Sequence, residues 1–159
     1  MKLAEALLLS DDLNHQRSTL QQRIHQNLLV QEGEVPTENP EQLIEQALHL
    51  NQKLYQLQYQ IECTRLSAQT LQGESLVQLL IRFDVLNENL RIVQQAIEKL
   101  HHDFPTYQTA HIRWVKATSV AELQQRADQL QAEIYQLRLT IEASNWQIDL
   151  VEVPTLQRC

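Results

Sequence analysis

Glycine, proline and cysteine are scarce in this chain, and each shortage limits the fold. Only two glycines and four prolines occur among the 159 residues. Because these residues form most turns, we expect few turns and therefore few, long secondary-structure elements. The two cysteines, Cys63 and Cys159, are too few for a disulfide framework. This composition favours a reducing compartment, and we expect a cytoplasmic protein.

Long apolar runs are also missing. No stretch approaches the roughly 18 consecutive apolar residues of a membrane span, so a membrane protein is not expected. The apolar run at residues 3–9 contains Glu5 and is followed by Asp11 and Asp12, without the small-residue cleavage site of a secretion signal. The net charge of -7 disfavours nucleic acid and anionic membrane surfaces as partners.

What the sequence does contain is a regular spacing of apolar residues. Between Ser119 and Trp146 they recur at intervals of three and four, without Gly or Pro, as in helices that pack along one seam. This seam consists of Val120, Leu123, Ala127, Leu130, Ile134, Leu137 and Ile141. Ser119 and Glu122 have the spacing of a capping box at the start of the helix.

The same alternation predicts three further helices, at about residues 2–31, 40–69 and 76–102. Gly33 can adopt the left-handed conformation that ends a helix. Asn39 is placed to cap the second helix, with Pro40 at its first position, where no backbone N–H is needed.

The four predicted helices are related in pairs. The second and fourth match when they are shifted by about 80 residues, which aligns Tyr55 with Tyr135. The first and third match at a shift of about 73, which aligns Asp11 with Asp84. These matches indicate a duplicated helical hairpin, with hairpins at about residues 2–69 and 76–146. Because one hairpin cannot bury its apolar seam alone, the predicted fold is all-α, a single up-down four-helix bundle over residues 1–159.

Two short stretches, residues 110–116 and 148–153, have the alternation of β-strands. A straight fourth helix would hold their near ends about 40 Å apart. Pairing within one chain would therefore need a bent helix or a long fold-back, whereas pairing between two antiparallel chains needs neither. We predict a homodimer, or a larger assembly of such dimers, held by these strands and by tryptophans. The predicted interface residues are Ile112, Trp114, Trp146 and Ile148.

Few residues have the character of a chemical site. His101, His102 and Asp103 form the only run with metal-ligand character, but adjacent side chains on a helix point about 100° apart and rarely share a metal. The alternative is a favourable interaction with the helix dipole. Asp11 and Asp84, at equivalent positions of the repeat, could form a carboxylate pair, or could face solvent or pair with arginine.

Recognisable catalytic signatures are missing. The Glu-x-x-His pattern of di-iron bundles, phosphate loops, nucleophile elbows and paired-cysteine zinc motifs do not occur. We therefore expect no cofactor, and the pattern favours a role that is not enzymatic.

Several segments resemble a bacterial family of uncharacterised helical proteins, some of whose members are labelled septicolysin. They are residues 1–7 (Met-Lys-Leu-Ala-Glu-Ala-Leu), 27–36, 120–123 (Val-Ala-Glu-Leu) and 145–146 (Asn-Trp). The similarity runs over most of the chain. The label implies a pore-forming toxin, whereas the sequence lacks a secretion signal and an alternating hairpin long enough to cross a bilayer. No motif is a catalytic signature, so the resemblance transfers no functional residue.

Three functions follow as expectations. The first is a cytoplasmic helical-bundle protein that acts through protein–protein contacts, as a homo-oligomer. The second, which rests on the septicolysin label, is a membrane-active cytolysin. The third, which rests on Asp11, Asp84, His101 and His102, is a metal-dependent or small-molecule-binding enzyme. The sequence identifies no ligand and no partner other than the chain itself.

Overall fold

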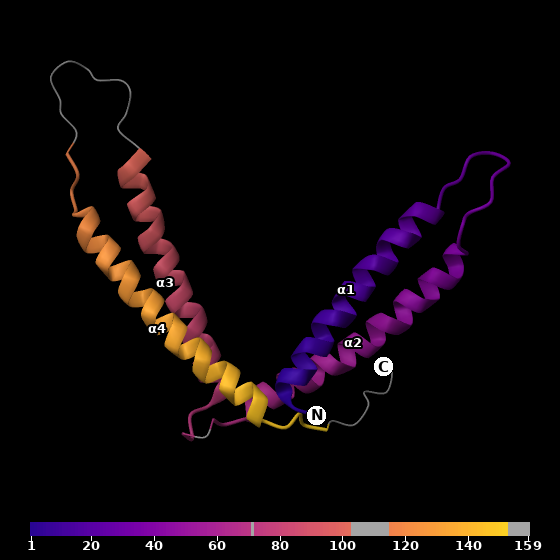
Figure 1. Cartoon of the computed structure of the whole chain (residues 1–159). Helices are drawn as coiled ribbons and strands as arrows, with labels where there is room; N and C mark the ends of the chain where they lie inside the picture. The colour runs from indigo at the N-terminus through magenta and orange to yellow at the C-terminus, as the bar shows by residue number, and fades with distance from the viewer. Residues whose placement is uncertain (71, 103–114, 153–159) are drawn as a thin grey trace, which may run out of the picture. The chain divides into compact units, whose positions relative to one another are not determined.

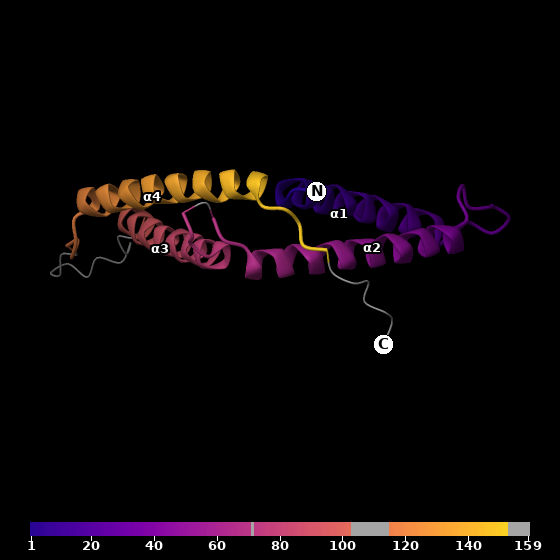
Figure 2. The same cartoon turned by 90° about the horizontal axis from the view of Figure 1, so that it is seen from below.

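The chain is all-α, as the sequence predicts. A computed structural model describes residues 1–70, 72–102 and 115–152, which contain four long helices (Figure 1). They are α1 (Leu3–Asn27), α2 (Pro40–Ser67), α3 (Leu76–His102) and α4 (Val120–Gln147). In both views α1 lies beside α2 and α3 beside α4, so the predicted up-and-down pairing into two hairpins is confirmed (Figure 2).

Two compact units contain these hairpins. The first unit comprises Met1–Ser75 together with the chain from Ser144 onward, and the second comprises Leu76–Ala143. The first therefore holds α1, α2 and the end of α4, and the second holds α3 and most of α4. In each unit the core is the strip along which two helices face each other.

In the first unit, the predicted seam of α2 is buried against α1. The buried side chains of α2 are Leu43, Leu54, Leu57, Ile61 and Thr64. The apolar spacing of the first helix, which includes Leu13 and Leu28, predicts its contact less accurately. Ala6, Ser10 and Asn27 are more deeply buried than Leu13, and Leu28 is 50% exposed. Small side chains let a neighbouring helix approach closely, which explains why they occupy the contact.

In the second unit, a core cluster lies along the predicted seams of α3 and α4. It consists of Leu79, Leu86, Ile134, Leu137 and Ile141, with Leu80, Phe83, Leu90 and Leu130 packed against it. The Arg138 guanidinium lies 5.6 Å from the centroid of the Phe83 ring, within the range of a cation–π contact.

Repeat-related positions of the two hairpins have matching environments. Leu3 and Leu76 are both fully buried. The Asn14 side-chain amide donates to the backbone carbonyl four residues earlier (2.9 Å), and Asn87 makes the same bond (2.7 Å). Both pairs are related by the shift of 73 residues on which the predicted duplication rests.

The predicted helix starts are confirmed by their hydrogen bonds. The Asn39 carboxamide oxygen accepts from the backbone N–H of Glu41 (2.9 Å), and Pro40 opens α2. The Ser119 hydroxyl oxygen accepts from the Glu122 backbone N–H at 3.4 Å, just before α4. Both side chains satisfy backbone donors that have no partner inside the helix.

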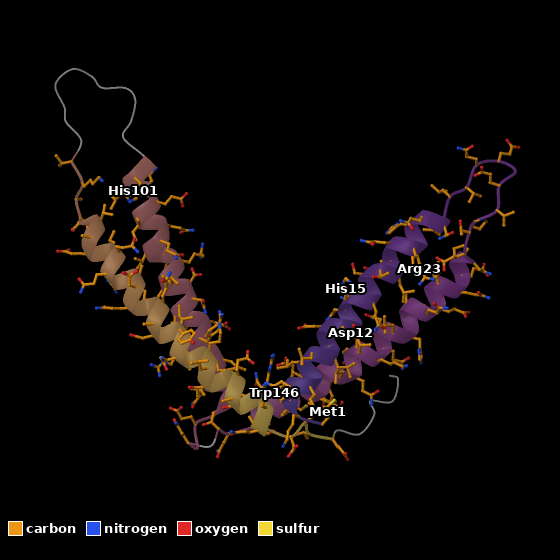
Figure 3. All side chains as sticks on the ribbon, in the orientation of Figure 1. Met1, Asp12, His15, Arg23, His101 and Trp146 are labelled. Carbon is orange, nitrogen blue, oxygen red and sulfur yellow. The ribbon has the colours of Figure 1, made fainter. Side chains whose placement is uncertain are left out.

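The end of α1 was predicted wrongly. The helix ends at Asn27, four residues before the expected position, because the returning chain binds there. The Asn27 side chain donates to the Arg23 carbonyl (2.9 Å) and accepts from the Glu38 backbone N–H (2.9 Å). Arg23, labelled in Figure 3, also forms an ion pair with Glu38 and holds the pKa of that carboxyl below its usual value through a hydrogen bond. These bonds fix the loop against the last turn of α1.

Gly33 has the expected positive φ, +91°, but it does not end the helix. It lies inside a turn in which the Glu34 N–H donates to the Gln31 carbonyl at 3.0 Å. A Cβ atom at this glycine would meet no atom within 4 Å, so the backbone conformation alone restricts the position.

Gly33→Val should therefore destabilise the protein by about 1–2 kcal/mol, the usual penalty of a left-handed conformation. Gly33→Asn should cost less, because asparagine tolerates that region. Chemical denaturation measures both values, and equal losses for the two variants would contradict a conformational role for the glycine.

Leu137→Ala should lower the free energy of unfolding by about 2–5 kcal/mol, because it leaves a cavity in the core of the second unit. Leu139→Ala, two residues later on the same helix, removes a side chain that is 48% exposed and should change stability much less. A loss below about 1 kcal/mol for Leu137→Ala, measured by the same denaturation, would place Leu137 outside the core.

Candidate functional site

The predicted polar candidates do not gather into a metal site in the part of the chain that the structure describes. Asp11, Asp84 and His101 are each exposed on their helices, and the His102 side chain lies outside the described part. His101 is labelled in Figure 3. Among the described residues, no group of three or more His, Cys, Asp and Glu side chains could hold a metal ion. In the same residues, no helix has both the length and the apolar character needed to cross a membrane.

The predicted interface residues are only partly visible. Ile112 and Trp114 lie outside the described residues. Trp146 is 52% exposed near the end of α4 (Figure 3). Ile148 is half-buried, and its backbone N–H donates to the Ser144 carbonyl at 2.9 Å.

Residues 148–150, within the segment expected to be a strand at residues 148–153, bind the start of the same chain instead. Lys2 and Asp149 form an isolated antiparallel bridge. The Leu3 N–H donates to the Ile148 carbonyl and the Leu150 N–H to the Met1 carbonyl, both at 2.9 Å. These groups therefore need no second chain, contrary to the argument that led to the strand-paired dimer. The sequence analysis missed this partner because it assigned Lys2 to the first helix.

Side chains strengthen this pairing. The Lys2 ammonium contacts the Asp149 carboxylate (2.8 Å) and donates to the Gln147 carbonyl (2.9 Å). The Val151 N–H donates to the hydroxyl oxygen of Thr64, which is fully buried on α2 and itself donates to the Gln60 carbonyl. We call residues 1–3, residues 148–151 and Thr64 the terminal clasp, because they join both ends of the described chain to α2.

A second strip of large apolar side chains lies on α2, away from its core. We call it the α2 apolar face; its members are Ile44, Leu48, Tyr55, Tyr59 and Leu66, each between 38% and 68% exposed. They recur at alternating intervals of four and seven, that is, every 11 residues. Eleven residues take about three turns of an α-helix, so the five side chains lie in one continuous line.

The same intervals recur on the other hairpin. Tyr135, Leu139 and Trp146 on α4 correspond to Tyr55, Tyr59 and Leu66 at the shift of 80 residues, and all three are exposed. On α3, Ile81, Val85 and Ile92 have the same spacing of four and seven and are also exposed. The sequence contains this signal, but the stronger alternation of three and four on the buried seams concealed it.

Tyr59 also bonds to its own helix. A side-chain hydrogen bond with Cys63, four residues later, raises the pKa of Tyr59 above its usual value. A tyrosine phenol is neutral at physiological pH even at its ordinary pKa, so the α2 apolar face carries no charge at that position.

A groove of about 310 Å³ lies between α3 and α4 in the second unit. It is lined by Asn89, Ile92, Val93, Ala96, Leu123, Arg126 and Leu130. Apart from Asn89 and Arg126 these side chains are apolar. Ile92 belongs both to the groove and to the exposed strip of α3, so the apolar surface of this helix continues into the groove.

A family model described as a family of unknown function, DUF6847, matches residues 10–150. The chain belongs to that family. This DUF6847 protein is also similar to a crystal structure described as a functionally unknown conserved protein from Corynebacterium diphtheriae. The TM-score is 0.85 at 27% sequence identity, and the match covers 95% of this chain and 99% of that chain. Among curated proteins, none matches.

The comparisons agree with the sequence analysis in one respect, since the family is uncharacterised. None of them shows the septicolysin label that the sequence resemblance suggested. The exposed helix faces and the terminal clasp are therefore the features of this DUF6847 protein from which a function must be argued.

Thr64→Val should weaken the clasp of the DUF6847 protein by about 0.5–1.5 kcal/mol, because the substitution removes the hydroxyl that accepts from the Val151 N–H. Thr19→Val is the matched control: the Thr19 hydroxyl makes only the corresponding bond to a carbonyl four residues earlier. Hydrogen exchange at the Val151 amide reports the clasp directly. Unchanged protection of that amide in Thr64→Val would contradict the assigned bond.

Proposed function

We propose that this DUF6847 protein is not an enzyme but acts through protein–protein contacts, as a homo-oligomer. The observation that carries this proposal is the α2 apolar face. Five large apolar side chains in one line on α2 are left exposed by the α1–α2 hairpin. Contiguous exposed apolar surface of this kind marks interaction sites, because burial against a partner removes it from water.

The repeat supports the same proposal. Each hairpin carries an exposed line of apolar residues in addition to its buried seam, and Tyr55 and Tyr135 occupy equivalent positions in these lines. Aromatic side chains are enriched at protein interfaces, where they contribute much of the binding energy. A chain with two such lines offers more than one contact, as an oligomer larger than a dimer would need.

The predicted interface residues and the predicted compartment both remain predictions within this proposal. Ile112 and Trp114 remain candidate interface residues together with the exposed Trp146, whereas Ile148 already bonds within its own chain. The cytoplasm remains the proposed compartment, on the argument from the two cysteines.

Light scattering at micromolar concentration tests the proposal. The wild-type protein should give at least twice the chain mass of 18.6 kDa. The double variant Leu48→Glu and Leu66→Glu should shift the mass toward that of one chain, because a buried carboxylate without a partner opposes association.

The matched control is Gln46→Glu and Gln58→Glu, which adds the same charge to α2 at exposed positions outside the apolar face. This variant should keep the wild-type mass. A wild-type protein that is monomeric at micromolar concentration would end the homo-oligomer proposal, and an equal loss of mass in both variants would implicate net charge instead of the face.

A further inference from the structure

The terminal clasp has a counterpart elsewhere in the first unit. Residues 68–75, which connect α2 to α3 and which we call the hairpin junction, contain an isolated antiparallel bridge between Gln69 and Ser75. The bridge of the clasp joins Lys2 and Asp149. A shift of 73 residues takes Lys2 to Ser75, and a shift of 80 residues takes Gln69 to Asp149. The two bridges are therefore equivalent under the same two shifts that relate the helices.

A backbone hydrogen bond is repeated in the same way. In the hairpin junction the Thr70 N–H donates to the Glu74 carbonyl at 2.8 Å. In the clasp the Leu150 N–H donates to the Met1 carbonyl at 2.9 Å. The shift of 80 residues takes Thr70 to Leu150, and the shift of 73 takes Met1 to Glu74. The clasp is therefore a second copy of the hairpin junction.

The two copies differ in how their two sides are held together. In the hairpin junction a segment of three residues, 71–73, connects the two sides, and the bridged Gln69 and Ser75 are uncharged. In the clasp the two sides are far apart in the sequence, and the bridged residues have opposite charges. The Lys2 ammonium lies 2.8 Å from the Asp149 carboxylate. The clasp thus has an ion pair, whereas the hairpin junction has a short covalent connection.

We infer that the terminal clasp is a releasable strap, a copy of the hairpin junction in which a surface ion pair replaces the covalent connection. When the strap opens, residues 148–151 leave the start of α1 and Thr64, while the hairpin junction stays closed. This opening goes beyond the association of chains proposed above and does not depend on it, because the contacts that it breaks lie within one chain.

The contacts of the clasp favour opening. The side chain of Lys2 is 39% exposed and that of Asp149 is 76% exposed. Ion pairs in contact with water contribute little to stability and are screened by salt. A segment held by a few such bonds opens locally while the rest of the molecule stays folded. In the hairpin junction the short connection returns the two sides to each other after each opening, because closing a short loop costs little entropy.

Hydrogen exchange of the full-length chain tests the strap at two equivalent amides, Leu150 in the clasp and Thr70 in the hairpin junction. Protection is measured as the exchange rate of the unfolded chain divided by the observed rate. Leu150 should be about tenfold or more less protected than Thr70, because opening of the strap exposes its amide. Raising the salt concentration from about 0.02 M to about 0.5 M should lower the protection of Leu150 and leave that of Thr70 unchanged, because salt screens the ion pair.

Charge variants test whether the ion pair holds the strap. Lys2→Asp alone and Asp149→Lys alone should each lower the protection of the Leu150 amide by at least about threefold, because like charges then face each other. The two changes combined restore an ion pair and should restore the protection. Lys53→Asp is the matched control, since it makes the same change of charge at an exposed position of α2 and should leave the Leu150 amide unchanged.

A disulfide can replace the missing covalent connection in the full-length chain. The residues that flank Lys2 and Asp149 make the backbone bonds, so these two face each other as a non-hydrogen-bonded pair, with Cα atoms about 4.5 Å apart. This distance suits a disulfide. In a background with Cys63→Ser and Cys159→Ser, Lys2→Cys with Asp149→Cys should therefore form a link within one chain. Oxidation should raise the protection of Leu150 toward that of Thr70, and reduction should reverse it.

Low protection of the Leu150 amide that is restored by the exchanged charges and by the disulfide supports the inference. A wild-type Leu150 amide as well protected as that of Thr70 would overturn it, because the clasp would then be as permanent as the hairpin junction. Single charge variants that leave the Leu150 amide unchanged would also overturn it. On a non-reducing gel, a disulfide that forms between chains, or not at all, would contradict a clasp closed within one chain, and this result does not depend on the folding of the charge variants.

Discussion

Two helices that lie side by side can bury only one strip of each other, and this limit governs the molecule. The seam of α2, with Leu54 and Ile61, is buried in the first unit, where α2 packs against α1. The helix nevertheless carries a second apolar line, from Ile44 to Leu66, which its own hairpin cannot cover. Since exposed apolar area costs free energy in water, the surplus points to contacts made outside the hairpin.

Polar interactions set where each helix begins and ends. At the end of α1, the Asn27 side chain accepts a hydrogen bond from the backbone N–H of Glu38 in the loop. The next residue after Glu38, Asn39, caps the start of α2. At the opposite end of the hairpin, Thr64 accepts from Val151 and so ties the chain after α4 to α2. The apolar face of α2, from Ile44 to Leu66, lies on a helix without Gly or an internal Pro.

The spacing of apolar residues was enough to predict the four helices, the seams of α2, α3 and α4, and the caps at Asn39 and Ser119. These features depend on residues close together in the sequence. The terminal clasp was missed because its bonds join Lys2 to residues near 149, a separation that no local pattern records. The early end of α1 was missed for the same reason, since Asn27 bonds across a loop to Glu38.

The candidate site was present in the sequence but was not recognised. Tyr55 and Tyr135 were noted as repeat-related, without the neighbours at intervals of four and seven that make them part of a line. A helix with two apolar lines has less contrast between an apolar and a polar side. The seam with the more regular spacing was therefore recognised, and the second line was not. Exposure in the folded hairpin distinguishes the two lines, and it requires the structure.

The central claim, that the α2 apolar face joins copies of this chain, is tested most directly by coupling between spin labels on two copies. One label replaces Gln58, which is exposed and lies outside the apolar face. A contact along α2 predicts dipolar coupling between copies at micromolar concentration, and loss of that coupling when Leu48 and Leu66 are both replaced by glutamate. No coupling at micromolar concentration, or coupling that survives both replacements, would contradict the account.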